Sequence, residues 1–177
     1  MRPEAIPAYV SALGVIAAMY WQIREWRRAS LTNRMATITS YESRFEAAEF
    51  RDLRRVAARY LLAHDATEPA GRDATKAIVN FFESIGYLFE KGMLKDEDVW
   101  QFFASWLVPY YIASEKVRAE ESENDPNVYS SVGNVYLAVL AVEAKKHPTG
   151  QTSHLIAPKA VRAFLDDECK LVVRSAA

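Results

Sequence analysis

The residues that come closest to catalytic chemistry surround a glutamate in an aromatic run. Glu83 directly follows Phe81 and Phe82, and a carboxylate among apolar side chains can have a raised pKa and act as an acid or a base. On a helix, however, Glu83 shares a side with Asn80, opposite the apolar stripe. Carboxylates are rarely buried without a partner. We therefore expect Asn80 and Glu83 to form a polar helix pair that bonds to a neighbouring helix.

The histidines and the single cysteine form no recognisable site. His64, His147 and His154 are not spaced to place two ligands on one helical face. Cys169 has no histidine near it in sequence, so we interpret it as a structural residue. The sequence also lacks a Gly-x-Ser-x-Gly motif, a phosphate-binding loop and a dinucleotide fingerprint. It therefore predicts no catalytic residue, no metal and no cofactor.

The charge balance argues against nucleic acid as a partner. Lys and Arg total 22 against 23 Asp and Glu, a net charge of −1, so no global field attracts a polyanion. One arginine-rich helix face is interleaved with Asp52, and we interpret it as a solvated face. Its arginines are Arg51, Arg54, Arg55 and Arg59.

Composition predicts a folded chain. Of its 177 residues, 50% are hydrophobic and 25% are charged, which excludes an intrinsically disordered protein and fits one domain with an appendage. The single cysteine excludes an internal disulfide and fits a reducing compartment.

An uncharged N-terminal run predicts a membrane anchor. Residues 6–23 contain no Asp, Glu, Lys or Arg, and as a helix they would span roughly 27 Å, close to the thickness of a bilayer core. Aromatic and basic side chains follow, which places this end at a membrane interface. The residues assigned to that interface are Tyr20, Trp21, Arg24, Trp26, Arg27 and Arg28.

Because the positive charge follows the run, we predict an uncleaved single-pass helix in the cell inner membrane, with the N-terminus outside and the C-terminal domain cytoplasmic. The alternative is that residues 6–23 pack as a buried helix of a soluble domain. A strip of small residues, Ser11, Gly14 and Ala18, suggests self-association into a homo-oligomer through this helix.

The remaining pattern predicts an all-α protein. Apolar spacing extends the first helix to Phe45 and predicts helices over 50–61, 78–89, 97–111, 132–140 and 158–173. Residues 64–72 and 115–125 are expected to be a loop and a polar helix end with linker, Gly92 should end a helix, and Pro109 should kink one. The predicted organisation is an anchor with a basic flank at 1–28, a cytoplasmic helical bundle at 29–146, and a C-terminal loop and short helix at 147–177.

The order of three segments resembles a known family. They are residues 80–86 (Asn-Phe-Phe-Glu-Ser-Ile-Gly), residues 91–98 with a glycine and an acidic helix start, and residues 126–129 (Pro-Asn-Val-Tyr). Together with the N-terminal run, this order resembles a family of short bacterial membrane-associated proteins known as a domain of unknown function. The resemblance covers roughly residues 10–145 and implies an all-helical fold with membrane association. It implies no catalytic residues.

Aromatic residues are densest between residues 81 and 111. Trp100, Phe103 and Tyr111 do not share one helical stripe with the other rings of their helix, so the helix is apolar over a wide arc. We interpret these three residues as the contact surface of a non-catalytic partner-binding or scaffolding module that binds an unidentified protein. The alternative is a small-ligand sensor or an enzyme. Its pocket would lie between the helices near 78–91 and 97–112, with Glu83, Tyr87 or His64 supplying polar groups.

Overall fold

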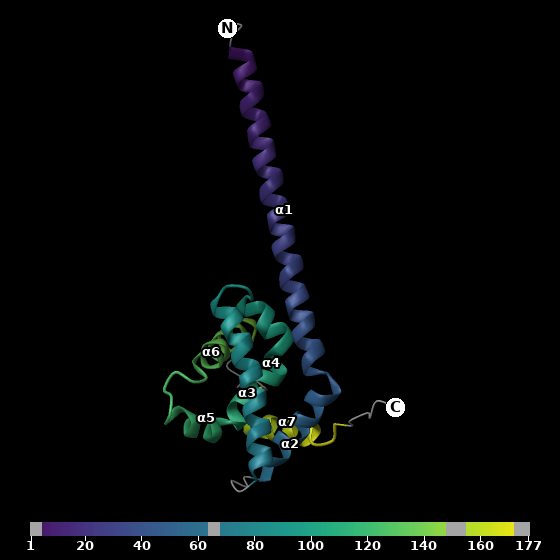
Figure 1. The fold of residues 1–177 in the computed structure, drawn as a ribbon, viewed down its shortest axis with the longest axis vertical. Helices are drawn as coiled ribbons and strands as arrows, with labels where there is room; N and C mark the ends of the chain where they lie inside the picture. The colour runs from purple at the N-terminus through teal and green to yellow at the C-terminus, as the bar shows by residue number, and fades with distance from the viewer. Residues whose placement is uncertain (1–4, 64–67, 148–154, 172–177) are drawn as a thin grey trace. The chain divides into compact units, whose positions relative to one another are not determined.

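The structure is a computed structural model that describes residues 5–63, 68–147 and 155–171, with the side chains of the first helix described from residue 18 onward (Figure 1). Within these residues the chain forms seven helices and no strand, which confirms the all-α prediction. Two compact units are present, residues 1–41 and 42–177. The helices are α1 (Ala5–Phe45), α2 (Ala48–Ala63), α3 (Pro69–Glu90), α4 (Asp96–Ala113), α5 (Glu115–Ser122), α6 (Ser130–Lys146) and α7 (Pro158–Glu168).

The first unit corrects the membrane prediction. No helix in the described part of the chain carries a stretch that is long and apolar enough to cross a membrane. The predicted transmembrane helix, its inner-membrane location and its topology are therefore wrong. The prediction relied on the absence of charge, whereas a span needs sustained apolarity, and residues 6–23 include Pro7, Ser11 and Gln22.

The residues assigned to a membrane interface lie on the exposed part of α1. The exposed fraction of Trp26 is 74%. Arg24 lies over the ring of Trp21, 6.0 Å from its centroid, and Arg28 forms a 3.5 Å ion pair with Glu25. In the small-residue strip, Ala18 is exposed, whereas the side chains of residues 11 and 14 lie outside the described set.

An aromatic cluster forms the core of the second unit. Phe45, in the last turn of α1, is completely buried. The ring centroids of Phe50, Phe81 and Phe82 lie 5.3, 5.0 and 5.5 Å from that of Phe45, and Trp106 lies at 4.8 Å. Rings at such separations contribute dispersion and quadrupole energy beyond the area they bury. The cluster ties α2, α3 and α4 to the end of α1.

Helix α3 begins earlier than the sequence pattern suggested. Pro69 and Gly71 were interpreted as breakers of a loop over 64–72, but α3 begins at Pro69. A proline at the first helical position loses no hydrogen bond, because that N–H has no partner inside the helix. Gly71 is buried against Tyr60, and a Cβ there would collide with that side chain. The glycine therefore allows α2 and α3 to approach closely.

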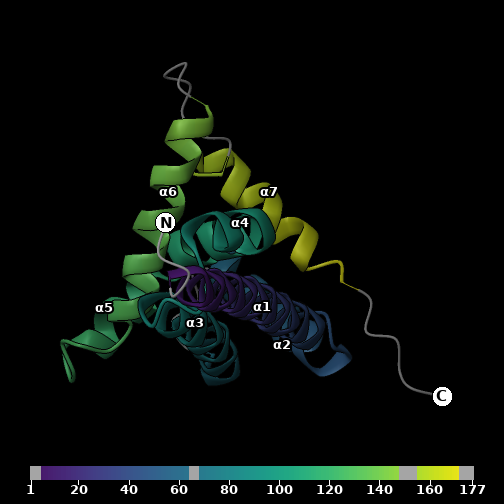
Figure 2. The same cartoon turned by 90° about the horizontal axis from the view of Figure 1, so that it is seen from above.

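Helix α4 lies between α6 and α7 and contacts both (Figure 2). The backbone N–H of Lys95 donates to the Asp98 carboxylate at 3.0 Å where α4 begins. The helix continues through the buried Pro109 to Ala113. Gly92 adopts a φ of +70° just after α3, which confirms that it ends that helix. The polar run after α4, expected to be a helix end and linker, contains α5.

Candidate functional site

A buried arginine lies at the centre of a polar network in the second unit. Arg54 of α2 is only 2% exposed, so its assignment to a solvated face was wrong. Its Nε and Nη2 donate to the two carboxylate oxygens of Glu168 in α7, at 2.7 and 2.6 Å. Its Nη1 donates to Glu46 at 2.9 Å and to the Phe45 carbonyl at 3.2 Å. This bidentate geometry is the strongest form of arginine–carboxylate pair.

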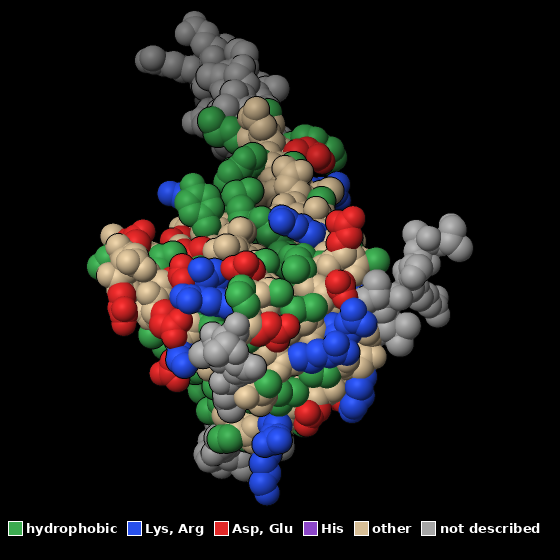
Figure 3. Space-filling model, turned by 60° about the horizontal axis from the view of Figure 1, so that its bottom comes forward, with side chains coloured by type: hydrophobic (Ala, Val, Ile, Leu, Met, Phe, Trp, Pro, Cys, Tyr) green, Lys and Arg blue, Asp and Glu red, His purple; other side chains and the backbone are tan. Residues whose placement is uncertain are grey.

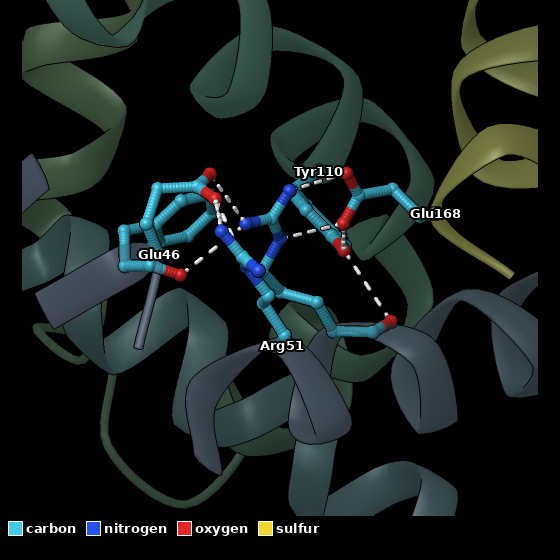
Figure 4. A network of polar contacts seen from close by, with 6 residues as sticks. Glu46, Arg51, Tyr110 and Glu168 are labelled. Carbon is cyan, nitrogen blue, oxygen red and sulfur yellow. Dashed lines mark hydrogen bonds and ion pairs between the residues drawn. The ribbon is translucent and has the colours of Figure 1, made fainter. Parts of the chain in front are cut away.

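Tyr110 of α4 completes this network (Figure 4). Its hydroxyl donates to Glu168 at 2.8 Å, and its ring meets Phe164 of α7 edge-on at 5.2 Å. Burial, with the neighbouring Glu168 charge, raises the pKa of Tyr110 well above its usual value. Burial alone would lower the pKa of Arg54, but hydrogen bonding to Glu168 and that group's charge raise it instead. The phenol is therefore neutral and the guanidinium charged at neutral pH.

The sequence carried a signal for these buried charges. Arg54 lies four residues after Phe50 and three before Ala57, so it sits within the buried stripe of α2. Glu168 continues the α7 stripe of Val161 and Leu165. A charged residue at a core position on each of two helices predicts a buried pair, because neither charge is stable there alone.

Glu46 links this network to a surface groove. Besides Arg54, it accepts hydrogen bonds from Arg51 at 2.8 and 3.1 Å (Figure 4). Burial alone would raise the pKa of Glu46, but the hydrogen bonds and charges of Arg54 and Arg51 together lower it. These contacts fix the corner where the chain leaves α1 and enters α2. That corner forms one wall of the groove.

The groove lies between this corner with α2 and the middle of α3, and its volume is about 460 Å³. We call it the α2–α3 groove. Such a volume falls within the range of natural binding sites, about 300–1,000 Å³. Leu53, which is 36% exposed, is the large apolar side chain at the surface of the groove, and the buried rings of Phe50 and Phe81, whose centroids lie 5.1 Å apart, line it from below. The lining residues are Arg44, Ala47, Glu49, Phe50, Leu53, Ala77, Asn80, Phe81 and Ser84.

Arg44 is the cation of this groove. Its guanidinium lies 6.0 Å from the centroid of Phe81. Among the described residues, no carboxylate pairs with Arg44, in contrast to Arg54. Glu49 and Asn80 place an acid and an amide at the same groove. Positive, negative and apolar side chains are similarly interspersed over the face shown in Figure 3. An apolar centre with a polar rim is the usual anatomy of a protein interface.

The predicted polar helix pair is divided between two surroundings. Glu83 accepts hydrogen bonds from the backbone N–H groups of Ser131 and Val132, at 3.2 and 2.7 Å, and so caps α6 from α3. Asn80 is exposed and lines the groove instead. A Cβ at Gly86 would collide with the Ser131 backbone, so the glycine permits the close crossing that lets Glu83 reach α6.

The three predicted partner-binding aromatics differ in accessibility. Phe103 is fully buried in the core, so it offers no surface to a partner. Trp100 is half-buried: its Nε1 donates to Glu143 at 2.6 Å, and the Lys146 ammonium lies 3.9 Å from its ring centroid. The helical arc was wide because α4 is central, with α6 and α7 on either side.

Tyr111 borders a second hollow of about 370 Å³ between α4, α5 and α6. Its ring stacks on Tyr136 with a centroid separation of 4.1 Å, and the Arg118 guanidinium lies 3.6 Å from the Tyr111 centroid. Arg118 also donates to the Tyr111 carbonyl at 2.9 Å. The ring of Tyr111 is therefore covered on its faces by residues of this chain.

The described residues include two of the polar groups considered for the alternative ligand pocket, Glu83 and Tyr87. In the described ranges, no three His, Cys, Asp or Glu side chains are grouped to hold a metal ion. His64 and His154 lie outside those ranges. Tyr87 is 54% exposed, and the Glu83 carboxylate is engaged by α6. Cys169 is half-buried, and burial raises its thiol pKa, which disfavours the reactive thiolate.

Comparison with known proteins identifies a family. A family model described as "Domain of unknown function (DUF4760)" matches residues 8–138, most of the chain. The chain matches no curated protein and no solved structure. The match agrees with the predicted resemblance over residues 10–145 in identifying a domain of unknown function, while bacterial origin stays a prediction. Residues 139–177, which include α7, lie beyond the match. The chain belongs to the DUF4760 family of domains of unknown function.

Proposed function

We propose that this protein is a non-catalytic partner-binding module that receives an amphipathic helix of another protein in the α2–α3 groove. The observation that carries the proposal is Arg44, an exposed cation without a carboxylate partner among the described residues, at a groove that it shares with the exposed Leu53. A partner helix would place an apolar side chain against the exposed Leu53, over the contacting rings of Phe50 and Phe81, and a carboxylate against Arg44. Binding of this kind uses apolar anchors one helical turn apart.

The composition of the groove favours a protein partner over a small metabolite. Its floor is aromatic, and arginine and aromatic residues are enriched at the centres of protein interfaces. The groove is open rather than enclosed, and both an acid and a base lie at its rim. The Glu46 contacts hold the corner wall in place before binding. A preorganised wall lowers the entropy lost on association.

Site-specific cross-linking tests this proposal. Leu53 is replaced by the photo-cross-linker p-benzoylphenylalanine in the full chain, which is expressed in cells of the organism that carries the protein. The cells are irradiated, and the cross-linked products are identified by mass spectrometry. We expect a cross-link to a defined segment of one other protein, formed by an amphipathic helix that carries an acidic residue. The exposed Leu137 on α6 provides a control position for the same cross-linker.

A variant that fills the groove makes the test specific. Ala47 is exposed at the groove wall, so Ala47→Trp should occupy the hollow without changing the core. The cross-link from position 53 should then disappear while the unfolding midpoint stays the same. An equal cross-link in the filled variant, or one equally strong from position 137, would contradict the proposal.

A further inference from the structure

The surface beneath α7 has the properties of a receptor. Arg54, Tyr110 and Phe45 belong to the part of the chain that the family model matches, whereas Glu168 and Phe164 of α7 lie beyond it. All of these α7 contacts converge on α2 and α4. The match ends inside α6, so both the end of that helix and α7 lie beyond it.

Arg54 is held in position without α7. Its guanidinium donates to Glu46 and to the Phe45 carbonyl, and it lies 4.3 Å from the Phe45 ring centroid and 5.7 Å from that of Trp106. If Glu168 departs, Arg54 still has one carboxylate and one carbonyl. The large penalty for a buried unpaired charge is thus avoided. These contacts would hold the Arg54 guanidinium in place when α7 leaves.

Helix α7 depends on docking for its own structure. It has 11 residues, and isolated helices shorter than about 12–15 residues are marginal in water. Its buried stripe of Val161, Leu165 and Glu168 supplies two apolar side chains and one carboxylate. We call the surface of α2 and α4 that contacts α7, with Arg54 and Tyr110 at its polar end, the α2–α4 face. The three stripe residues of α7 match the apolar part and the cation of this face.

We propose that the α2–α4 face is a preformed docking site for an amphipathic helix whose stripe ends in a carboxylate, and that α7 occupies it in cis as a detachable helix. The site recognises the carboxylate through Arg54 and the Tyr110 hydroxyl. It is separate from the α2–α3 groove, so it does not depend on the partner proposed there. The ligand that we propose for it is the segment of residues 155–171, which contains α7.

A binding experiment in trans tests this docking site. Val161→Asp with Leu165→Asp in the full chain should release α7, because both side chains are buried against the receptor. A fluorescent peptide of residues 155–171 is then titrated against this release variant, and anisotropy is recorded. We expect saturable binding to the release variant and none to the parent chain, whose site is filled. Ala163→Asp, at an exposed α7 position, should leave the site filled.

Competition by unlabelled peptides tests the role of the carboxylate. A peptide with Glu168→Gln should need an at least about tenfold higher concentration than the natural peptide to displace half of the label, because charge-assisted hydrogen bonds become neutral ones. A peptide with Asp167→Asn should compete equally, since that side chain is exposed and pairs with Lys170. Equal competition by all three peptides, or no saturable binding, would overturn the proposal.

Hydrogen exchange keeps the proposal testable if the release variant does not fold. In the parent chain, the α7 amides should exchange faster than those of α2 and α4, through opening of α7 alone. Glu168→Gln should accelerate exchange in α7 and leave α2 and α4 nearly unchanged. If α7 amides exchange only together with α2 and α4, the helix is an integral part of the core and the proposal fails.

Discussion

Arg54 and Arg44 lie on either side of the corner between α1 and α2, and each guanidinium faces a phenylalanine ring, yet their surroundings are opposite. Arg54 is buried and bonds to two carboxylates and a carbonyl. Arg44 is exposed at a groove, and within the described ranges no acid pairs with it. Arg54 therefore belongs to the folded core, whereas Arg44 is the arginine to which the proposed function assigns a partner's carboxylate. Glu46 connects the two regions because its contacts fix the groove wall.

The largest effect is expected at the buried arginine. Arg54→Met removes the cation that pairs with the buried Glu168 carboxylate and leaves it only the Tyr110 hydroxyl, which should cost about 3–5 kcal/mol of unfolding free energy. Urea denaturation at neutral pH measures this loss. Arg59→Met, at an exposed position on the same helix, should change stability by no more than about 0.5 kcal/mol. A similarly small loss for both variants would contradict this prediction, because Arg54 would then stabilise the fold no more than a surface arginine does.

Tyr110→Phe tests the other side of the network. At neutral pH it should cost about 1.5–3 kcal/mol, because the hydroxyl donates to a buried carboxylate. Tyr87→Phe, on an exposed ring, provides the control for the substitution itself. A neutral effect of Tyr110→Phe would show that the Tyr110–Glu168 bond contributes nothing to stability.

The raised pKa of Tyr110 predicts a pH dependence of stability that Tyr110→Phe should remove. The pKa of Tyr110 is raised in the folded chain above the unfolded value of 10.0, so the folded state retains a proton that the unfolded state loses. The contribution of Tyr110 to the free energy of unfolding is thus fully present below pH 10. It falls as the pH rises above 10, by up to about 1.4 kcal/mol per pH unit. Unfolding measured between pH 9 and 11 should show this contribution in the parent and not in Tyr110→Phe. Parallel profiles would contradict it.

An intermediate effect is expected at the shared carboxylate. Glu46→Gln should cost about 1 kcal/mol, since the side chain is partly exposed and solvent screens its pairs. The lowered pKa of Glu46 means that its contribution is present above pH 4.5 and is lost as pH falls through the folded value. The difference between parent and variant should therefore shrink in acid. Glu49→Gln is the matched control, and an equal loss there would remove the distinction.

The smallest effect on stability is expected at Arg44. Arg44→Ala should change the unfolding free energy by no more than about 0.5 kcal/mol, because the side chain is exposed and forms no ion pair with a described residue. Thermal and urea unfolding measure it together. A loss comparable to that of Arg54→Met would mean that Arg44 is structural and that the two regions do not differ in role.

The sequence predicted periodic features better than isolated charges. The all-α fold, the helix reaching Phe45 and the end of α3 before Gly92 follow from local spacing and backbone preferences. Arg54 was misplaced because its neighbours Arg51 and Arg55 suggested a solvated face, although its spacing from Phe50 placed it in the core. Pro69 suggested a break because its role at a helix start depends on where the helix begins.

The groove could not be predicted from spacing. It arises where Ala47, in the corner between α1 and α2, and Ala77 of α3 leave space beside Phe81. No local pattern relates those positions, since tertiary packing brings them together. The surplus aromatic arc of α4 likewise marked a central helix. Its surroundings in space, rather than its own sequence, determined which rings are buried.

The cross-link from position 53, measured in Arg44→Ala, tests whether Arg44 recognises the partner. If Arg44 is the recognition cation of the α2–α3 groove, the yield should fall about tenfold, as expected for the loss of a charge-assisted contact, while the unfolding midpoint stays at the parent value. An unchanged yield at an unchanged midpoint would contradict that role of Arg44, because the groove would then bind its partner without the cation.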